Sequence, residues 1–361
     1  MDFALVSKAF DVLKIDPPSK LILLEAQTLA SAHVPPYPPD MPVLLTNVDS
    51  QDMAEHLNRV LLTTYPEEHL LYLVSGDKKK EEKTGQVSRS EFSAPFSLYI
   101  PPLEEGSSFE AFAEIVAHLR APNGCPWDRE QTHESLRKHL LEETYEAISA
   151  IDSGDFTDMR EELGDLLLQI VLQSQIANEE AQFNINQVIQ GIHSKIVRRH
   201  PHVFGDLKLE GVDGVLANWE KLKEKERGER KEEKGLLDGV PLALPALSQA
   251  QEYQDRAARV GFDWPEIEGV LDKVKEELEE IKDAETDFEL ASEIGDLFFA
   301  LVNVARWKHI DAESALRGTN MKFKERFAYV EKGAKKQGRE LSSLSLQEME
   351  DLWQEAKKQQ G

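Results

Sequence analysis

The chain is poor in cysteine, in long apolar runs and in positive charge. Cys125 is its one cysteine, which excludes an intrachain disulfide framework and fits a reducing cytosol. No run of 18 uncharged apolar residues occurs, so we expect no membrane span and no membrane partner. The start, Met1-Asp2-Phe3-Ala4, lacks the basic residues and apolar run of a signal peptide. These absences predict a soluble, cytoplasmic protein.

Basic residues are strongly outnumbered. The 361 residues include 42 Lys and Arg against 67 Asp and Glu, for a formal net charge of −25. A chain this acidic is a poor candidate for binding nucleic acid through its general field, so we expect no nucleic-acid partner. Hydrophobic residues make up 40% of the chain, which suffices for ordinary globular cores. Any handling of phosphates must therefore depend on local cations and bound metal.

The composition changes along the chain. In residues 1–104, short apolar runs bounded by Pro, Asp or Gly predict a helix at 52–64 and strands near 21–24, 42–45, 70–74 and 96–100. The charged run 77–83 is interpreted as a solvated loop. From about residue 107, helical patterns dominate, and helices are expected over 108–120, 134–152, 158–179, 185–199, 212–228, 245–260, 266–284, 287–309, 312–332 and 346–358.

Two of these helices begin where an N-cap is expected, at Asp158 and Asp287. The charged segment 221–234 is either an exposed helix end or a linker. The predicted fold class is α+β overall, with a small α/β segment at the N-terminus followed by two all-α helical bundles.

An acidic pattern occurs twice in the helical part. Residues three or four apart share a face of a helix, so each copy places carboxylates together on two consecutive helices. Like charges this close are unfavourable unless a cation neutralises them, and an all-oxygen ligand set suits Mg²⁺ or Mn²⁺ rather than zinc. The first copy reads Glu142-Glu143-x-x-Glu146 then Glu162-x-x-Asp165; the second reads Glu276-Glu277-x-x-Glu280 then Glu293-x-x-Asp296.

The repeat extends beyond the acids. Trp127 and Trp264 precede the two clusters, and a Lys and an Arg four residues apart follow each of them. A single Glu-rich helix is more often a solvated surface than a metal site, but two ordered copies reverse that balance. The cations are interpreted as phosphate contacts rather than ordinary surface charges, and both Trp residues as core anchors rather than base-stacking groups. The mid-helix residues Gly164 and Gly295 predict a close approach of another backbone or a ligand.

Carboxylate-held Mg²⁺ beside cations suits a polyphosphate substrate. A bound metal neutralises phosphate charge and activates a water, and a spare carboxylate in each copy, Glu142 or Glu276, is predicted to accept the proton of that water. No GxxxxGK[ST] motif occurs, which argues against a P-loop NTPase.

Several motifs resemble the MazG nucleoside triphosphate pyrophosphohydrolases. They are the segment from Leu119-Arg120 through Cys125-Pro126-Trp127-Asp128, the two acidic signatures, Arg198-Arg199-His200-Pro201-His202, Val260-Gly261-Phe262-Asp263-Trp264 and Asn320-x-Lys322-Phe323-x-x-Arg326. The resemblance implies two tandem domains, at 108–230 and 241–358, in a homodimer of helical modules. It also implies hydrolysis of an NTP to NMP and pyrophosphate with Mg²⁺, in the service of nucleotide-pool house-cleaning.

The resemblance assigns roles residue by residue. Metal ligands would be Glu143, Glu146, Glu162, Asp165, Glu277, Glu280, Glu293 and Asp296. Nucleotide contacts would be Lys195, Arg198, Arg199, Lys273, Asn320, Lys322, Arg326 and Trp353. One departure is Glu252, which stands where the family commonly carries a Lys. If that Lys binds phosphate, the second site would be weakened.

Three motifs in residues 1–104 are Phe10-Asp11-x-Leu13-x-Ile15-Asp16-Pro17, the Tyr65-Pro66 turn and Ser97-Leu98-Tyr99-Ile100-Pro101-Pro102. They resemble the trailing half of a tetrapyrrole methylase-like domain, without the half that would hold S-adenosylmethionine. We therefore expect a structural or dimerising role there and no methyltransferase activity. Two other functions stay open. One is a non-catalytic nucleotide sensor or scaffold with vestigial carboxylates, and the other is a carboxylate-bridged redox metalloprotein, which the missing Glu-x-x-His ligands disfavour.

Overall fold

The computed structural model describes residues 3–89, 95–209 and 235–359, together with residues 211, 212, 214, 215, 218, 219 and 222. The chain divides into two compact units between Arg198 and Arg199. Most of the helix expected over 212–228, and nearly all of the charged segment 221–234, lie outside the described residues. None of the helices in the described part is long and apolar enough to cross a membrane.

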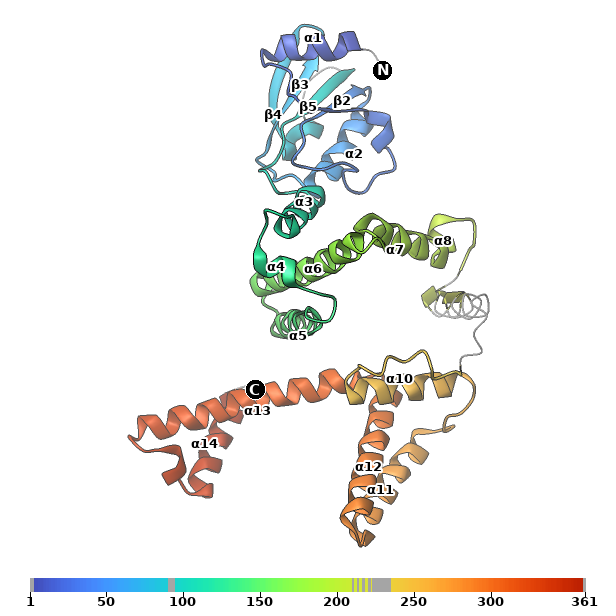
Figure 1. Cartoon of the computed structure of the whole chain (residues 1–361), viewed down its shortest axis with the longest axis vertical. Coiled ribbons are helices and arrows are strands. Elements are labelled where there is room, and N and C mark those ends of the chain that lie inside the picture. The colour runs from blue at the N-terminus through green and yellow to red at the C-terminus, as the bar shows by residue number, and fades with distance from the viewer. Residues whose placement is uncertain are drawn as a thin grey trace. The chain divides into compact units, whose positions relative to one another are not determined.

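A five-stranded sheet forms the N-terminal part of the first unit (Figure 1). Its strands are β1 (Ile22–Glu25), β2 (Val43–Val48), β3 (Leu70–Ser75), β4 (Lys78–Lys83) and β5 (Phe96–Ile100), in the order β1-β2-β5-β3-β4. The β1–β2 pair is parallel and the other pairs are antiparallel. The four strands expected from the apolar runs are confirmed.

Alternating side chains give this sheet two apolar faces. Val43 and Leu45 join a core with helix α2 (Gln51–Leu62), whereas Leu44 packs with helix α1 (Phe3–Leu13). Short 3-10 turns, η1 (Ala26–Leu29) and η2 (Thr84–Arg89), complete this part. The small α/β segment is thus covered by helices on both faces.

The prediction of a loop at residues 77–83 was wrong. Lys78–Lys83 is strand β4, paired with β3 along its whole length. The strand carries only Lys and Glu and has no apolar alternation, so no periodicity signalled it. A charged strand at the edge of a sheet opposes pairing with other chains, which gives a physical reason for this sequence.

The rest of the described chain is helical, as predicted. The helices of the first copy and its end are α3 (Phe109–Arg120), α4 (Pro126–Glu130), α5 (Arg137–Ser153), α6 (Phe156–Glu179), α7 (Ile185–Arg199) and α8 (Pro201–Phe204). Those of the second copy are α10 (Ala246–Arg259), α11 (Ile267–Asp283), α12 (Asp287–Trp307), α13 (Ala312–Lys336) and α14 (Leu346–Gln359), with the 3-10 turn η3 (Leu341–Ser343). The α+β fold class is confirmed.

Two helix caps differ from the prediction. Asp155 caps α6, since its carboxylate accepts hydrogen bonds from the amides of Thr157 (2.8 Å) and Asp158 (3.2 Å). Thr286 caps α12 in a capping box with Glu289. Asp158 and Asp287 lie inside the first turns, where the helix dipole also favours acids, so composition alone did not separate a cap from a first-turn residue.

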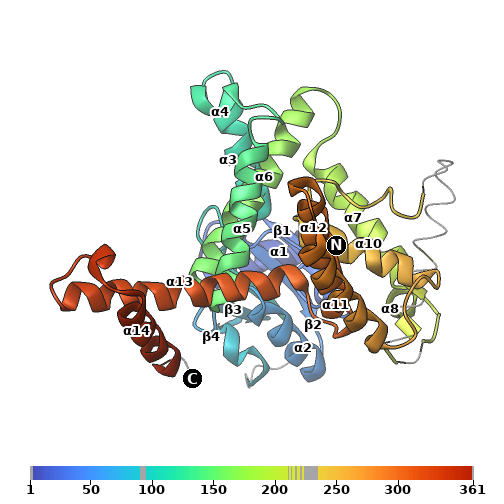
Figure 2. The same cartoon turned by 90° about the horizontal axis from the view of Figure 1, so that it is seen from below.

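Each copy contains a pair of packed helices that carries its acids. Helix α5 packs along α6 in the first unit, and α11 packs along α12 in the second, where Figures 1 and 2 show the two helices side by side. Helix α3 closes an apolar cluster with α6 around Val116, Leu172 and Ile176. Helix α14 packs against α13.

Candidate metal and nucleotide site

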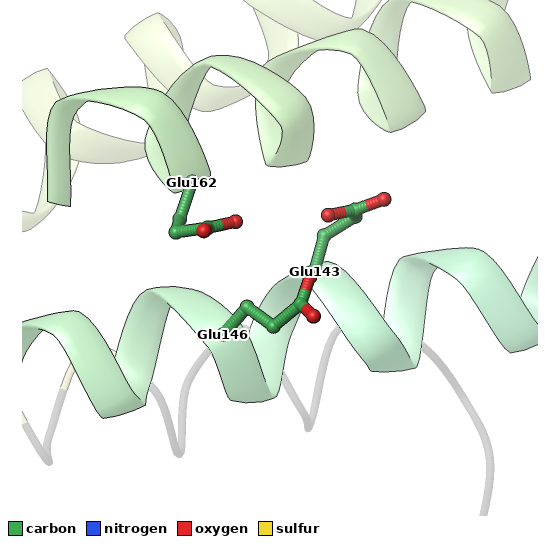
Figure 3. A group of neighbouring side chains, drawn as sticks. All are labelled: Glu143, Glu146 and Glu162. Carbon is green, nitrogen blue, oxygen red and sulfur yellow. The ribbon is translucent and has the colours of Figure 1, made fainter. Parts of the chain in front are cut away.

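The first acidic cluster forms between α5 and α6. Helix α5 supplies Glu143 and Glu146, α6 supplies Glu162, and one carboxylate oxygen from each lies within 4.8 Å of the others. Figure 3 shows Glu143 and Glu162 extending from facing helices toward the space between them. The prediction that helical spacing would gather these three carboxylates is therefore confirmed.

Proton affinity in this cluster reflects the crowding of acids. Burial and the charges of Asp165 and Glu146 raise the pKa of Glu143 above its ordinary value. Burial and the charges of Glu146 and Asp165 likewise raise the pKa of Glu162. Asp165 thus acts on both residues, although it is not one of the three within 4.8 Å. A bound cation would relieve this repulsion.

The second cluster has the same construction on α11 and α12. Oxygens of Glu277, Glu280 and Glu293 lie within 4.8 Å of one another. Glu277 is only 2% exposed, and its Oε2 atom has no hydrogen-bond partner. A buried carboxylate oxygen without a partner is costly unless a cation or donor satisfies it. The donor set and this orphaned atom both fit a hard divalent cation.

A lysine distinguishes the second cluster from the first. The Lys273 Nζ atom lies 2.6 Å from Glu277 Oε1 and 2.9 Å from Glu276 Oε1. Hydrogen bonds to Glu277 and Glu276 raise the pKa of Lys273, which keeps it charged. Burial and the charges of Glu277 and Glu293 raise the pKa of Glu280, which Lys273 only partly offsets.

A histidine occupies the matching place in the first copy, four residues before its paired Glu. His139 Nδ1 lies 3.6 Å from Glu142 Oε2. Sequence reasoning assigned Lys273 and missed His139, although the fixed spacing to Glu143 would have found it. Neither Glu142 nor Glu276 is one of the three acids of its cluster. Both are exposed; Glu142 lies near His139, whereas Glu276 shares Lys273 with Glu277.

Apart from Lys273, the predicted phosphate-binding residues lie on helices other than those of the acidic clusters. Helix α7 carries Lys195, Arg198 and Arg199. The Arg199 guanidinium lies 5.8 Å from the centroid of the Trp219 ring. Asn320, Lys322 and Arg326 are on α13. The Arg326 guanidinium lies 5.9 Å from the ring of Trp353 on α14, so the structure does bring this pair together.

The interpretation of the two Trp residues as core anchors was wrong. Trp127 is 56% exposed and Trp264 is 40% exposed. Trp264 instead lies against helix α11 at Gly269, where an added Cβ would stand 2.2 Å from the indole Cδ1. Its neighbour Asp263 accepts hydrogen bonds from Arg306 Nη2 (2.6 Å) and Trp307 Nε1 (3.2 Å), which fixes this loop on α12.

The close approach expected at the mid-helix glycines is absent inside the described chain. A Cβ added at Gly164 or Gly295 would meet nothing within 4 Å. The acid at Glu252 has a structural partner, because its Oε2 lies 3.1 Å from Arg256 Nε. Arg256 in turn donates to the carbonyl oxygens of Leu236 (3.1 Å) and Gly239 (3.0 Å) and so holds the loop before α10.

Paired helices with duplicated, all-oxygen acidic clusters define a class of helical proteins whose carboxylates could hold a metal ion. The MazG nucleotide pyrophosphohydrolase domain matches this chain twice, over residues 131–204 and 266–330. Each matched range contains one of the two acidic clusters. The chain belongs to the MazG family.

Similar proteins occur in several bacteria. The "Uncharacterized protein YabN" of Bacillus subtilis is 40% identical, with 96% of this chain and 73% of that protein covered. The "Nucleoside triphosphate pyrophosphohydrolase/pyrophosphatase MazG" of Thermotoga maritima is 44% identical, covering 70% and 97%. The "Nucleoside triphosphate pyrophosphohydrolase" of Escherichia coli K12 is 46% identical, covering 68% and 95%.

A crystal structure of a mazG-related protein from Thermotoga maritima matches 32% of this chain and 98% of that chain, at 27% identity. The TM-score of this match is 0.29.

Proposed function

We propose that this protein hydrolyses nucleoside triphosphates to nucleoside monophosphates and pyrophosphate. The observation that carries the proposal is the buried Glu277, whose unpartnered oxygen belongs to a carboxylate cluster that the first copy repeats. Relatives that are 44% and 46% identical are named nucleoside triphosphate pyrophosphohydrolases, which supports the same reaction.

Mg²⁺ is the proposed metal, with Mn²⁺ as an alternative. Glu277, Glu280, Glu293 and Asp296 would hold it in the second copy, and Glu143, Glu146, Glu162 and Asp165 in the first. When bound, the ion neutralises phosphate charge and lowers the pKa of a water. The all-carboxylate donor set favours these ions over zinc.

The chain's own residues would complete the site. Glu276 is the proposed proton acceptor of the second copy, since its contact with Lys273 holds its carboxylate beside Glu277. Glu142, whose Oε2 atom lies 3.6 Å from His139 Nδ1, would serve in the first copy. Side chains of α7, α11 and α13 would bind phosphate oxygens, with Trp353 near the nucleotide; the residues are Lys195, Arg198, Arg199, Lys273, Asn320, Lys322 and Arg326.

A second copy of the chain would complete the helical bundles. Apolar side chains beside the acids remain exposed in each unit, including Leu163 and Leu167 on α6 and Ile294 and Phe298 on α12. Surfaces of this kind mark interfaces, and the open space at Gly295 leaves room for a close helix. We therefore propose a homodimer, with helical domains at 108–230 and 241–358, acting in the cytoplasm. The role of residues 1–104 as a methylase-like remnant stays a prediction.

Product analysis tests the reaction directly. The purified protein is incubated with each NTP and dNTP and Mg²⁺, and NMP, NDP, pyrophosphate and phosphate are resolved. We expect NMP with pyrophosphate, lost when Glu146→Gln and Glu280→Gln are combined. Glu279→Gln, on the same helix but paired with Lys282 at 2.7 Å, is the matched control and should retain turnover. Nucleotide binding without turnover would favour a sensor or scaffold instead.

A further inference from the structure

Arg120 ends helix α3 and has no part in the proposed hydrolysis. Its side chain is only 6% exposed, and its Nε and Nη2 atoms donate to the carboxylate of Glu179, the last residue of α6, at 2.7 to 3.1 Å. Its Nη1 atom donates to the carbonyl oxygen of Asp128 and, at 3.2 Å, to that of Gln131. One buried guanidinium therefore joins α3, the end of α6 and the segment of α4.

The contact between Arg120 and Glu179 has a fixed geometry. Two nitrogens of the guanidinium grip one carboxylate, which sets the orientation of both groups. Gln175 Nε2 also donates to Glu179 Oε1, at 3.0 Å. The hydrogen bonds from Arg120 lower the pKa of Glu179, so the carboxylate stays charged beside the guanidinium. A lysine could keep the ion pair but could not make the same set of bonds.

The segment that Arg120 holds carries an exposed tryptophan. Trp127 lies on α4, and its carbonyl oxygen accepts a hydrogen bond from Gln131 Nε2 at 3.1 Å. Its ring stands edge-on to that of His139 on α5, with 6.3 Å between the ring centroids. His139 in turn lies 3.6 Å from Glu142, the proposed proton acceptor. A contiguous set of contacts thus runs from Arg120 to the first acidic site.

The second copy fixes its tryptophan segment with the charges exchanged. There the arginine, Arg306, lies on α12 and donates to Asp263, the residue before Trp264, at 2.6 Å. In both copies an arginine–carboxylate pair ties the tryptophan segment to the C-terminal end of the second acidic helix, which is α6 or α12. Two different contacts with the same result indicate that the position of this segment matters to the site.

We infer that Arg120 is a positioning residue of the first acidic site. It fixes α4 so that Trp127 keeps its contact with His139, and His139 keeps its place beside Glu142. This inference rests on the proposed function, because it takes Glu142 as the proton acceptor. Arg120 touches neither the substrate nor the metal in this account, so its replacement should lower kcat and leave the binding of Mn²⁺ intact.

Turnover of the first copy is measured in a Glu280→Gln background. Arg120→Lys should lower kcat about tenfold, since small displacements near a reacting group cost up to about 100-fold. Mn²⁺ binding, followed by electron paramagnetic resonance, should stay unchanged. Arg137→Lys is the matched control, because Arg137 is exposed at the start of α5 and donates to the Glu134 carbonyl oxygen at 3.5 Å. The control should change neither kcat nor Mn²⁺ binding.

A double-mutant cycle shows whether Arg120 acts through Trp127. If it does, Trp127→Ala should also lower kcat, and the double variant should be no slower than the slower single variant. Losses that multiply would overturn the inference, because Arg120 would then act by another route. A loss of Mn²⁺ binding in parallel with kcat would also overturn it, because it would leave Arg120 a role in folding alone.

Fluorine NMR separates this inference from the proposed function. The chain has five tryptophans, and in protein labelled with 5-fluorotryptophan the Trp127→Ala variant identifies the resonance of Trp127. Arg120→Lys and His139→Ala should each shift this resonance and leave the others in place. That result would support the positioning contacts even if the first copy hydrolysed no NTP. A Trp127 resonance that neither substitution moves would refute the inference, and so would displacement of all the resonances together.

Discussion

Replacing Gly269 with Ala tests how closely Trp264 packs on α11. Helix propensity alone predicts that Gly→Ala stabilises by about 1 kcal/mol. At Gly269, however, the new Cβ would stand 2.2 Å from Trp264 Cδ1, far inside contact distance, so the indole must move. Overpacking of this kind costs about 1–3 kcal/mol. We therefore expect Gly269→Ala to lower the free energy of unfolding by about 0–2 kcal/mol.

Gly318→Ala on α13 is the matched control, because its added Cβ meets nothing within 4 Å. It should show the full propensity gain of about 1 kcal/mol. Urea unfolding followed by tryptophan fluorescence and by circular dichroism would report both variants. Equal stabilisation by the two substitutions would show that Trp264 does not lie against Gly269.

Three further predictions concern the acidic clusters and the exposed helices. Lys273→Met leaves Glu277 buried without its ion pair and should lower the free energy of unfolding by about 1–3 kcal/mol, and Mg²⁺ should reduce this loss. Thermal melts with and without Mg²⁺ measure it, and equal losses in both conditions would contradict the prediction. Folding raises the pKa of Glu143 and of Glu280, so the folded state binds more protons than the unfolded state. The two carboxyl groups therefore contribute stability at a pH below their unfolded pKa. This contribution is lost as the pH rises from the unfolded pKa through the folded pKa. The metal-free melting temperature of Glu143→Gln/Glu280→Gln should therefore fall less over this range than that of the native protein, and identical pH profiles would oppose the account. Leu167→Lys and Phe298→Lys together should convert a species of twice the 40.9 kDa chain mass into a monomer by sedimentation, whereas a native chain that is already monomeric would refute the proposed dimer.

Helical periodicity and acid spacing were sufficient to predict most of the fold and the three glutamates that meet in each cluster; the predicted ligands Asp165 and Asp296 are not among the clustered acids. Glu143, Glu146 and Glu162 meet because i,i+3 spacing on one helix faces a second helix, a relation that local sequence specifies. Strand β4 escaped prediction because its charged residues form a strand only through pairing with β3. Tertiary contacts decide such elements, and no local pattern reports them.

The less predictable features of the site depend on distant residues. The position of Trp264 follows from Gly269 and from the bonds of Asp263 to α12, so its large apolar surface was wrongly assigned to a core. The unpartnered Gln254 Oε1 appears only once its amide nitrogen is seen bound to Phe299. Residue type and spacing do not contain this information.

Counting bound metal ions tests the central claim that both acidic clusters are metal sites that serve hydrolysis. Mn²⁺ binding is measured by electron paramagnetic resonance alongside NTP turnover, in the native protein, Glu143→Gln, Glu277→Gln and the double variant. We predict that each single substitution abolishes one class of Mn²⁺ site and that the double variant loses both, together with pyrophosphate release. Unchanged Mn²⁺ binding in the double variant, or turnover that survives it, would contradict the account.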